Sequence, residues 1–185
     1  MQRFRERYQK EVVPQLMAKF GYQNPLAVPK VEKVLINSGF GRETVSLAPE
    51  EQRKMQQILL EDLASISGQK PVLTQAKKSI ASFKLRKGLT VGAKVTLRGR
   101  KMEDFIDRFI QIVLPRSRDF RGLDPQSFDR SGNLTVGLKE QITFPEVSPE
   151  SVRKIFGLEV TVVTTAKSSA EGLELLKQLG FPFKA

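Results

Sequence analysis

The sequence lacks the residue types on which most enzyme chemistry depends. It has no cysteine, histidine or tryptophan in 185 residues, and only two tyrosines. The absence of cysteine excludes disulfides, thiol nucleophiles and thiolate-held metals, and the absence of histidine removes the commonest general base and metal ligand. No apolar run approaches the ~20 residues of a membrane-spanning helix, and none follows the N-terminus as in a signal peptide. We therefore expect neither a conventional enzyme nor a membrane protein, and no cofactor or metal.

Carboxylates are also missing from one long stretch of the chain. Asp62 and Glu103 are successive acidic residues, so positions 63–102 contain none. The chain has 31 Lys and Arg against 20 Asp and Glu, a net charge of +11, and ten of these cations lie in that stretch, so the remainder is almost neutral. A merely solvated charged face usually mixes both signs. The stretch, which we call the basic stretch, therefore favours a polyanionic partner, either nucleic acid or an anionic membrane surface.

Hydrophobic periodicity and turn residues predict one α+β domain over residues 1–185. Helices are expected over residues 3–20, 49–67, 102–113 and 168–179. Strands are expected over residues 30–38, 72–75, 89–98, 133–139 and 158–165. Pro14 should break or kink the first helix, and Pro115 should end the third, because proline lacks the amide N–H and clashes with the preceding turn.

Alternation within the strands predicts a sheet with two different faces. In the strand over 89–98, apolar side chains alternate with Lys94, Thr96 and Arg98, and alternate residues point to opposite faces. Such a pattern is typical of an antiparallel or mixed sheet with helices on one face only. The open polar face would be available to RNA or another partner.

A glycine-containing turn follows the first strand. Gly39 and Gly41 resemble the start of a dinucleotide-binding fingerprint, but Thr44 stands where the third glycine should be, so the fingerprint fails. We expect instead a tight turn at which a backbone or a phosphate approaches closely.

Three acids offer a weak alternative of another class, an RNA-acting enzyme that holds Mg²⁺. Glu103, Asp104 and Asp107 could share one helix face, although acids in a first helical turn also interact favourably with the helix dipole. A free-standing RNA chaperone is a further alternative. Phe83 is the single aromatic residue of the basic stretch, so we expect contacts to phosphates, sugars and 2′-hydroxyls of a structured RNA rather than base stacking.

Several motifs in fixed order resemble one known family. They are GQKPV (68–72), AKKSIA (76–81), FKLR (83–86), VTLRG (95–99), LPRSRDFRG (114–122), GN (132–133), KEQ (139–141), FPE (144–146), VVTTA (162–166) and GFPF (180–183). Together they resemble the bacterial-type large-subunit ribosomal protein five family, which binds 5S ribosomal RNA. The resemblance runs from about residue 8 to residue 184. It implies a structural protein of translation, in the central protuberance of the large subunit of cytoplasmic ribosomes.

The resemblance also implies site residues and partners. It implies 5S RNA contacts at Asn37, Gln69 and Thr96, to which the turn and the polar strand face add neighbours, so that the expected set is Asn37, Gly39, Gly41, Gln69, Lys70, Lys94, Thr96 and Arg98. It implies contact between the basic loop and the elbow of peptidyl-site transfer RNA through Lys77, Lys78, Ser79 and Lys84. Further implied partners are 23S-type ribosomal RNA, neighbouring large-subunit proteins and a small-subunit head protein across a bridge. The chain departs from the family pattern at Ser38, Gln75, Ser82 and Ala93.

Overall fold

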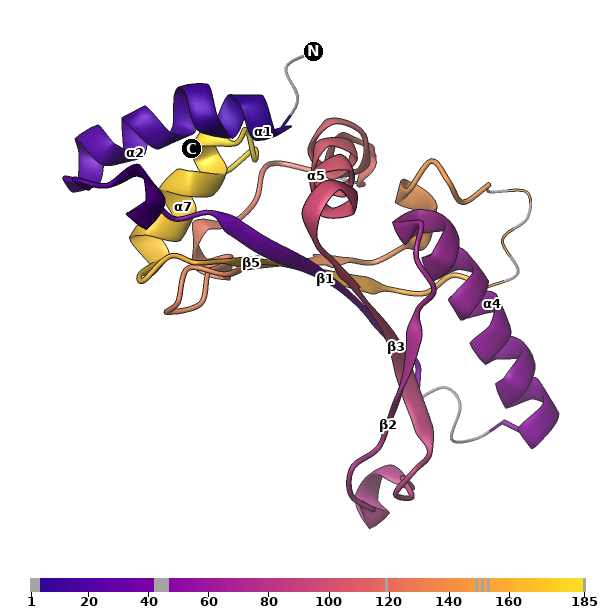
Figure 1. Cartoon of the computed structure of the whole chain (residues 1–185). Coiled ribbons are helices and arrows are strands. Elements are labelled where there is room, and N and C mark those ends of the chain that lie inside the picture. Colours follow the sequence, from indigo (N-terminus) through magenta and orange to yellow (C-terminus); the bar gives the residue numbers. More distant parts are fainter. Residues whose placement is uncertain are drawn as a thin grey trace. The chain divides into compact units, whose positions relative to one another are not determined.

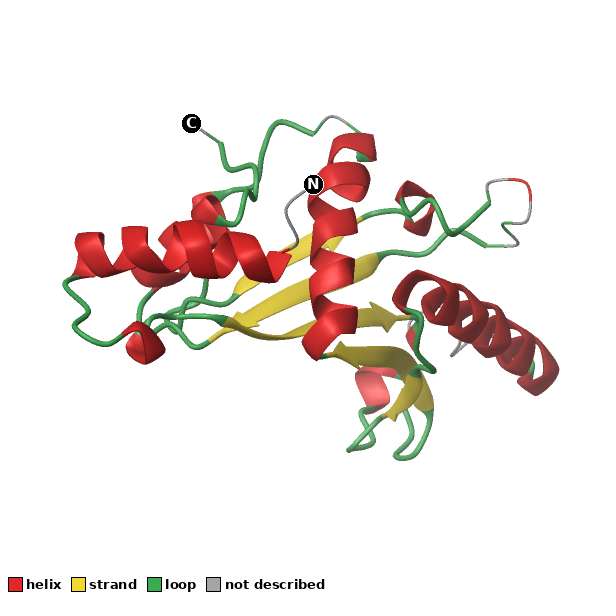
Figure 2. Cartoon of the chain, turned by 45° about the horizontal axis from the view of Figure 1, so that its top comes forward, coloured by secondary structure: helices red, strands yellow, loops and turns green. Residues whose placement is uncertain are grey.

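The structure, a computed structural model, describes residues 4–41, 47–118, 120–148, 150, 152 and 154–184. Within these ranges the fold is α+β, with four helical segments and a five-stranded antiparallel sheet in the order β2-β3-β1-β5-β4 (Figures 1 and 2). The strands are β1 (Val31–Gly39), β2 (Val72–Gln75), β3 (Thr90–Leu97), β4 (Leu134–Leu138) and β5 (Leu158–Thr164). The predicted fold class is confirmed, and each strand begins and ends within about one residue of its expected bounds.

Contacts between residues divide the chain into two compact units. Unit 1 comprises Met1–Val34, Leu97–Val136 and Thr161–Ala185, and unit 2 comprises Leu35–Thr96 and Gly137–Val160. Strands β1, β3, β4 and β5 have residues in both units, whereas β2 belongs to unit 2 alone. A single domain over residues 1–185 stays a prediction, because this division by contacts does not test it.

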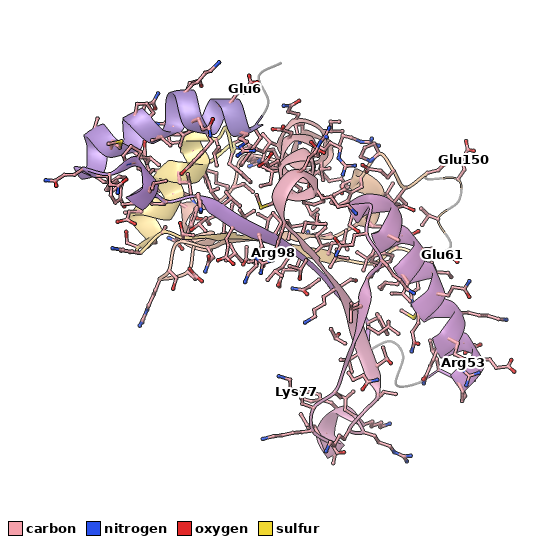
Figure 3. The ribbon with its side chains drawn as sticks, in the orientation of Figure 1. Glu6, Arg53, Glu61, Lys77, Arg98 and Glu150 are labelled. Atoms are coloured by element: carbon pink, nitrogen blue, oxygen red, sulfur yellow. The ribbon has the colours of Figure 1, made fainter. Side chains whose placement is uncertain are left out.

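Unit 2 contains one long helix, α4 (Pro49–Ser67), together with parts of the sheet. Pro49 occupies the first turn, where a missing N–H leaves no hydrogen bond unmade, and Gly68 ends the helix with a φ of 62°. Arg53 and Glu61 lie on its exposed side (Figure 3). Its buried side carries Met55, Leu59, Leu63 and Ile66. The predicted bounds of this helix are confirmed.

Unit 1 holds the other α-helices whose bounds the structure describes. They are α1 (Phe4–Arg7), α2 (Val13–Phe20), α5 (Gly99–Arg108), α6 (Leu114–Arg116) and α7 (Ser169–Gln178). No helix in the described part of the chain combines the length and the apolar character that crossing a bilayer requires.

Two helical segments of unit 1 pass through a proline. A wide π turn, Tyr8–Val12, joins α1 to α2 just before Pro14, and a second, Phe109–Val113, joins α5 to α6 just before Pro115. At each turn, the amide before the proline donates to the carbonyl five residues back. The wider turn accommodates the proline ring, which in a regular α-helix would clash with the carbonyl four residues back.

These turns correct the expectation for the third helix. We expected Pro115 to end it, but the segment begins at Gly99 and continues past Pro115 to Arg116. Pro14 likewise interrupts the regular hydrogen-bonding pattern without ending its helix. The irregularity that we expected at Pro14 is therefore a local π turn inside a continuous helical segment.

Helix α7 begins with two capping hydrogen bonds. The Ser168 hydroxyl accepts a 3.3 Å hydrogen bond from the amide of Glu171, and the Glu171 carboxylate accepts a 2.9 Å bond from the amide of Lys167. Lys19 of α2 forms a 2.7 Å ion pair with Glu174. The hydrogen bond from Lys19 is the main reason that the pKa of the Glu174 carboxyl lies below its usual range. The Lys19–Glu174 ion pair attaches α7 to α2 within unit 1.

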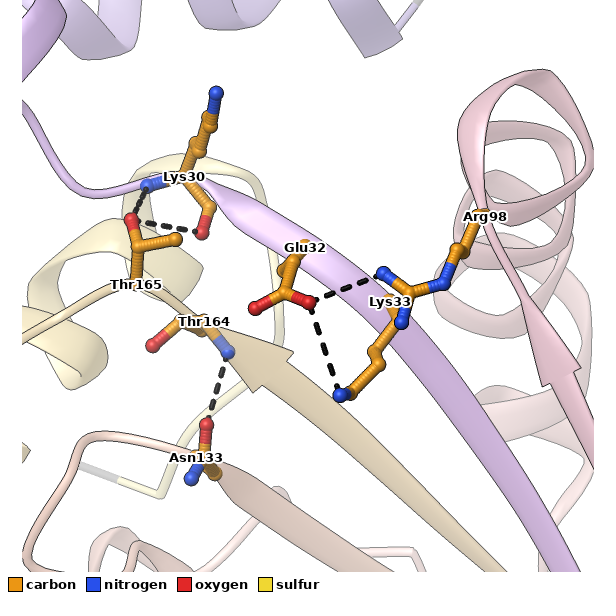
Figure 4. Close-up of polar contacts among 7 residues, drawn as sticks. All are labelled: Lys30, Glu32, Lys33, Arg98, Asn133, Thr164 and Thr165. Carbon is orange, nitrogen blue, oxygen red and sulfur yellow. Dashed lines mark hydrogen bonds and ion pairs between the residues drawn. The ribbon is translucent and has the colours of Figure 1, made fainter.

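Two glycines bring a turn and α7 into backbone contact in unit 1. Gly132 has a φ of 76°, in the left-handed region that favours glycine, and its carbonyl accepts a 2.9 Å hydrogen bond from the Thr164 hydroxyl. The Asn133 side chain accepts another 2.9 Å bond, from the Thr164 amide (Figure 4). A Cβ atom on Gly172 would lie 2.7 Å from the Cα of Gly132. The motif residues Gly132, Asn133 and Thr164 therefore have a structural role.

Candidate nucleic-acid interface

In unit 2, predicted RNA-binding side chains occupy the less buried face of two neighbouring strands. Asn37 of β1 is half-buried, whereas Ile36 and Ser38 on either side of it are buried. Lys94 is exposed and Thr96 half-buried along β3, where they alternate with buried apolar residues. Strands β1 and β3 are adjacent in the sheet. The predicted alternation is therefore confirmed.

The structure adds the segment before β2 to this face. The Gln69 amide donates a 3.2 Å hydrogen bond to the backbone carbonyl of Thr96. Val72 pairs with Lys94 in the antiparallel register of β2 and β3, and opposite residues of such a pair point to the same face. Continuing that register places Lys70 opposite Thr96. We call the surface formed by Asn37, Gln69, Lys70, Val72, Lys94 and Thr96 the open face.

Most cations expected at the interface have no acidic partner. Among the described residues, no carboxylate lies within 4 Å of the ammonium groups of Lys70, Lys77, Lys78, Lys84 and Lys94. The Lys77 side chain projects from the turn that joins β2 to β3 (Figure 3). Because no described acidic residue neutralises these charges, they remain available to attract phosphates.

Arg98 differs from the other expected RNA-binding cations. It belongs to unit 1, where its guanidinium forms a 3.0 Å ion pair with Glu32 (Figure 4). Lys33 lies 3.7 Å from the same carboxylate. The hydrogen bond from Arg98, followed by the charge of Lys33, holds the pKa of the Glu32 carboxyl below its usual range. The charge of Arg98 is therefore already partly compensated, and its assignment to the 5S RNA contact stays a prediction.

The two glycines after β1 have different surroundings. A Cβ atom on Gly41 would lie 3.1 Å from the Cβ of Val91, so this glycine allows a close approach within the protein. A Cβ atom on Gly39 would meet no atom of the described residues within 4 Å, so these residues leave the Gly39 backbone open to an incoming group. Thr44 lies outside the described residues.

Sequence reasoning missed Gly92, in the middle of β3. A Cβ atom there would lie 2.6 Å from the carbonyl oxygen of Ser38 and 3.0 Å from the Thr74 hydroxyl oxygen. The strands on both sides therefore pack closely only because residue 92 is glycine. The signal was present in the sequence, since a glycine inside a strand pattern often marks a close backbone approach.

The turn between β2 and β3, the hairpin tip, is closed by several hydrogen bonds. Ile80 and Leu85 exchange two backbone bonds, of 3.0 and 3.1 Å, and the Ser79 hydroxyl accepts a 2.9 Å bond from the Lys87 amide. Lys84 has a φ of 51°, the one positive φ among the described non-glycine residues. Ser79, expected to contact transfer RNA, thus also holds the tip together.

The three acids proposed as a magnesium site do not form one. Among the described residues, no group of three acidic side chains is placed to hold a metal ion. Asp104 instead lies 3.8 Å from Arg100, one helical turn away. Partial burial is the main reason that the pKa of Asp107 is raised. The arrangement gives no support to a metal-dependent enzyme.

Comparisons with known proteins agree along the whole chain. Residues 24–86 match the family described as Ribosomal protein L5, and residues 90–183 match the family that describes the C-terminus of the same ribosomal protein. The chain is 52% identical over 184 residues to the large ribosomal subunit protein uL5 of Syntrophomonas wolfei, with 100% of both chains covered. The chain belongs to the ribosomal protein L5 family.

Two further L5 family members support this result. The uL5 protein of Carboxydothermus hydrogenoformans is 51% identical over 183 residues, with 99% of each chain covered, and that of Halothermothrix orenii is 50% identical over 178 residues, with 96% covered. The L5 family consists of structural proteins of the large ribosomal subunit. The predictions of the family, of a role in translation and of a protein that is not an enzyme are therefore confirmed. The assignments of individual RNA-binding residues stay predictions.

Proposed function

We propose that the chain binds 5S ribosomal RNA through the open face of unit 2. The observation that carries this proposal is the hydrogen bond between Gln69 and the Thr96 carbonyl. It brings polar groups from two segments onto one surface, together with lysines that have no acidic partner among the described residues. A surface that only covers the core usually carries both signs of charge, whereas the open face carries lysines.

The open face offers the groups that structured RNA requires. The ammonium groups of Lys70 and Lys94 suit phosphates, which provide much of the affinity. The Asn37 amide and the Thr96 hydroxyl suit 2′-hydroxyls and base edges, which distinguish RNA from other polyanions. The open space beside Gly39 would allow the sugar-phosphate backbone to approach the end of β1.

Salt dependence tests the electrostatic part of this proposal. If about six phosphates are neutralised, the logarithm of the 5S RNA association constant should fall with the logarithm of salt concentration with a slope of roughly −4 to −5. Filter binding of the purified protein to 5S RNA over a range of potassium chloride concentrations measures this slope. A slope near zero would mean that lysine–phosphate contacts do not drive binding.

We further propose that the hairpin tip contacts the elbow of peptidyl-site transfer RNA through Lys77, Lys78 and Lys84, with Ser79 holding the loop in shape. The exposed position of these lysines and the absence of described acidic partners support this assignment. By resemblance to the family, we also propose contacts with 23S-type RNA, neighbouring large-subunit proteins and a small-subunit head protein across a bridge.

The double variant Lys77→Ala/Lys78→Ala should separate the two RNA contacts. We expect its 5S RNA affinity to be almost unchanged, because neither lysine belongs to the open face. Ribosomes carrying the variant should bind peptidyl-site transfer RNA about fivefold more weakly, or about 1 kcal/mol, for two exposed phosphate contacts. The loss should shrink as salt rises, because exposed charges are screened over about 8 Å at physiological ionic strength.

A matched control removes two cations from another part of unit 2. Arg53→Ala/Lys54→Ala changes the charge equally on the exposed side of α4 and should leave transfer RNA binding unchanged. Equal losses toward both RNAs in the Lys77/Lys78 variant would show that the open face and the hairpin tip form one continuous RNA contact.

A further inference from the structure

The hairpin tip contains an apolar groove that phosphate contacts alone do not explain. The groove has a volume of about 840 Å³, and Ile80, Phe83, Leu85 and Val91 form its apolar part. Gly41 also lines it. All of these residues belong to unit 2, so the groove is a feature of one compact unit.

Phe83 presents an aromatic ring to solvent at this groove. It is 64% exposed, and Ile80 beside the groove is 42% exposed. Exposed apolar clusters of this kind usually mark a site of interaction. The two Ile80–Leu85 backbone hydrogen bonds close the loop around Phe83, and Lys84 takes up a left-handed conformation, which a residue other than glycine adopts at a cost. The backbone that carries the ring is therefore held in a closed turn.

The rim of the groove determines what kind of partner fits. Lys77, Lys78 and Lys84 line it together with the apolar residues, and no carboxylate occurs in the sequence between Asp62 and Glu103. The partner must therefore combine a flat apolar surface with negative charge. A nucleotide has both, because its base stacks on aromatic rings while its phosphate pairs with cations.

We propose that the groove binds a nucleobase of the RNA at the hairpin tip, stacked on Phe83, while the lysines of the rim bind the adjoining phosphates. This inference rests on the proposed function only in that the tip contacts transfer RNA. The composition of the basic stretch argued against base stacking, but one exposed aromatic ring on a closed turn is sufficient for a stacking contact. The tip would then recognise a nucleotide that is not enclosed within a helix, and not the sugar-phosphate backbone alone.

Substitutions at Phe83 test the stacking contact in ribosomes reconstituted with variant protein and filled with deacylated transfer RNA. We expect Phe83→Ala to weaken peptidyl-site binding roughly fivefold to 100-fold, the range measured for loss of one base–aromatic stack. Phe83→Leu should lose most of this affinity although it keeps an apolar side chain, and Phe83→Tyr should restore it. Unlike the loss caused by Lys77→Ala/Lys78→Ala, the Phe83 loss should not shrink as salt rises, since stacking is not screened.

Two controls keep the result interpretable. Leu26→Ala removes a side chain of unit 1 that is 92% exposed and should leave transfer RNA binding unchanged. Every variant should also keep its 5S RNA affinity and melting temperature, which excludes misfolding. Photo-crosslinking of the wild-type complex, followed by mass spectrometry, should find a transfer RNA base attached to the peptide that contains Phe83.

The outcomes distinguish this inference from the proposed function. If the lysine variant weakens transfer RNA binding but the Phe83 variants do not, stacking is wrong and the transfer RNA contact stands. If neither variant weakens binding, both are wrong. A Phe83 crosslink to a ribosomal protein instead of a base would show that the groove binds protein, and would overturn the inference.

Discussion

Replacing Gly172 by alanine is expected to destabilise the protein by about 2–3 kcal/mol, the cost of overpacking a closely packed site. The added Cβ would lie 2.7 Å from the Cα and 2.8 Å from the carbonyl carbon of Gly132. Both atoms belong to backbone that other bonds hold in place, including the 2.9 Å bond from Thr164 to the Gly132 carbonyl. Neither side can therefore move away without breaking hydrogen bonds.

Helix propensity alone predicts the opposite sign for this substitution. Alanine is favoured over glycine in a helix interior by about 1 kcal/mol, and Gly172 lies within α7. We expect the steric cost to exceed this gain, so thermal unfolding followed by circular dichroism should show a melting temperature lower by about 5–10 °C. Gly137→Ala is a matched control, because a Cβ there would meet nothing within 4 Å. Similar melting temperatures for the two variants would contradict the packing argument.

The triple variant Asn37→Ala/Gln69→Ala/Thr96→Ala should lose most of its 5S RNA affinity. Each substitution removes a hydrogen-bonding group from a surface that binding would desolvate, at about 1 kcal/mol or more. The combined loss should approach 3 kcal/mol, or about 100-fold. The single losses at Gln69 and Thr96 should not be strictly additive, because the Gln69 side chain contacts the backbone of residue 96 and the two residues are neighbours on the surface. Filter binding at constant salt measures each step.

The same triple variant should melt at nearly the wild-type temperature. Gln69 is exposed, and Asn37 and Thr96 are only half-buried, so their loss leaves the core of unit 2 intact. Thr135→Ala, which removes an exposed threonine from β4, serves as a control and should not change 5S RNA affinity. Large unfolding effects together with unaltered RNA affinity would show that the three residues are structural.

Local chemistry explains which parts of the fold could be predicted from sequence. The bounds of α4 follow from Pro49 at its start and Gly68 just after its end, both of which act within one turn. The course of the helix past Pro115 could not be predicted in the same way. A helix that reaches a proline can either end there or widen into a π turn and continue. The packing of the surrounding segment decides between these two outcomes.

The candidate interface could likewise be predicted only in part from the sequence. Alternation along one strand is enough to place Lys94 and Thr96 on the open face, because it requires only the period of two. The partners of these residues lie far away in sequence. Gln69 is 27 residues from the carbonyl that it binds, and Glu32 is 66 residues from Arg98, whose charge it compensates. Such pairs depend on the topology of the sheet, which the single-strand pattern does not contain.

Two departures from the family pattern also have a structural explanation. Ser38 and Ala93 are both buried in unit 2. The Ser38 hydroxyl donates a 2.9 Å hydrogen bond to the carbonyl of Gly157, so this polar residue is satisfied in the core. Gln75 and Ser82, in contrast, are exposed on the hairpin, and nothing in the structure explains why they replace the usual residues.

The order in which the two units are assembled from the chain has a consequence for biosynthesis. Unit 2 takes its last segment from Gly137–Val160, and unit 1 takes its last segment from Thr161–Ala185. A ribosome that is translating this chain must therefore produce residue 160 before unit 2 has all its parts, and it must release residues 169–178 before α7 can join unit 1. Folding during synthesis, which usually proceeds from the N-terminus, is thus delayed for both units. The unit that carries the proposed 5S RNA-binding surface would be complete only after residue 160 has left the ribosome that is making the chain.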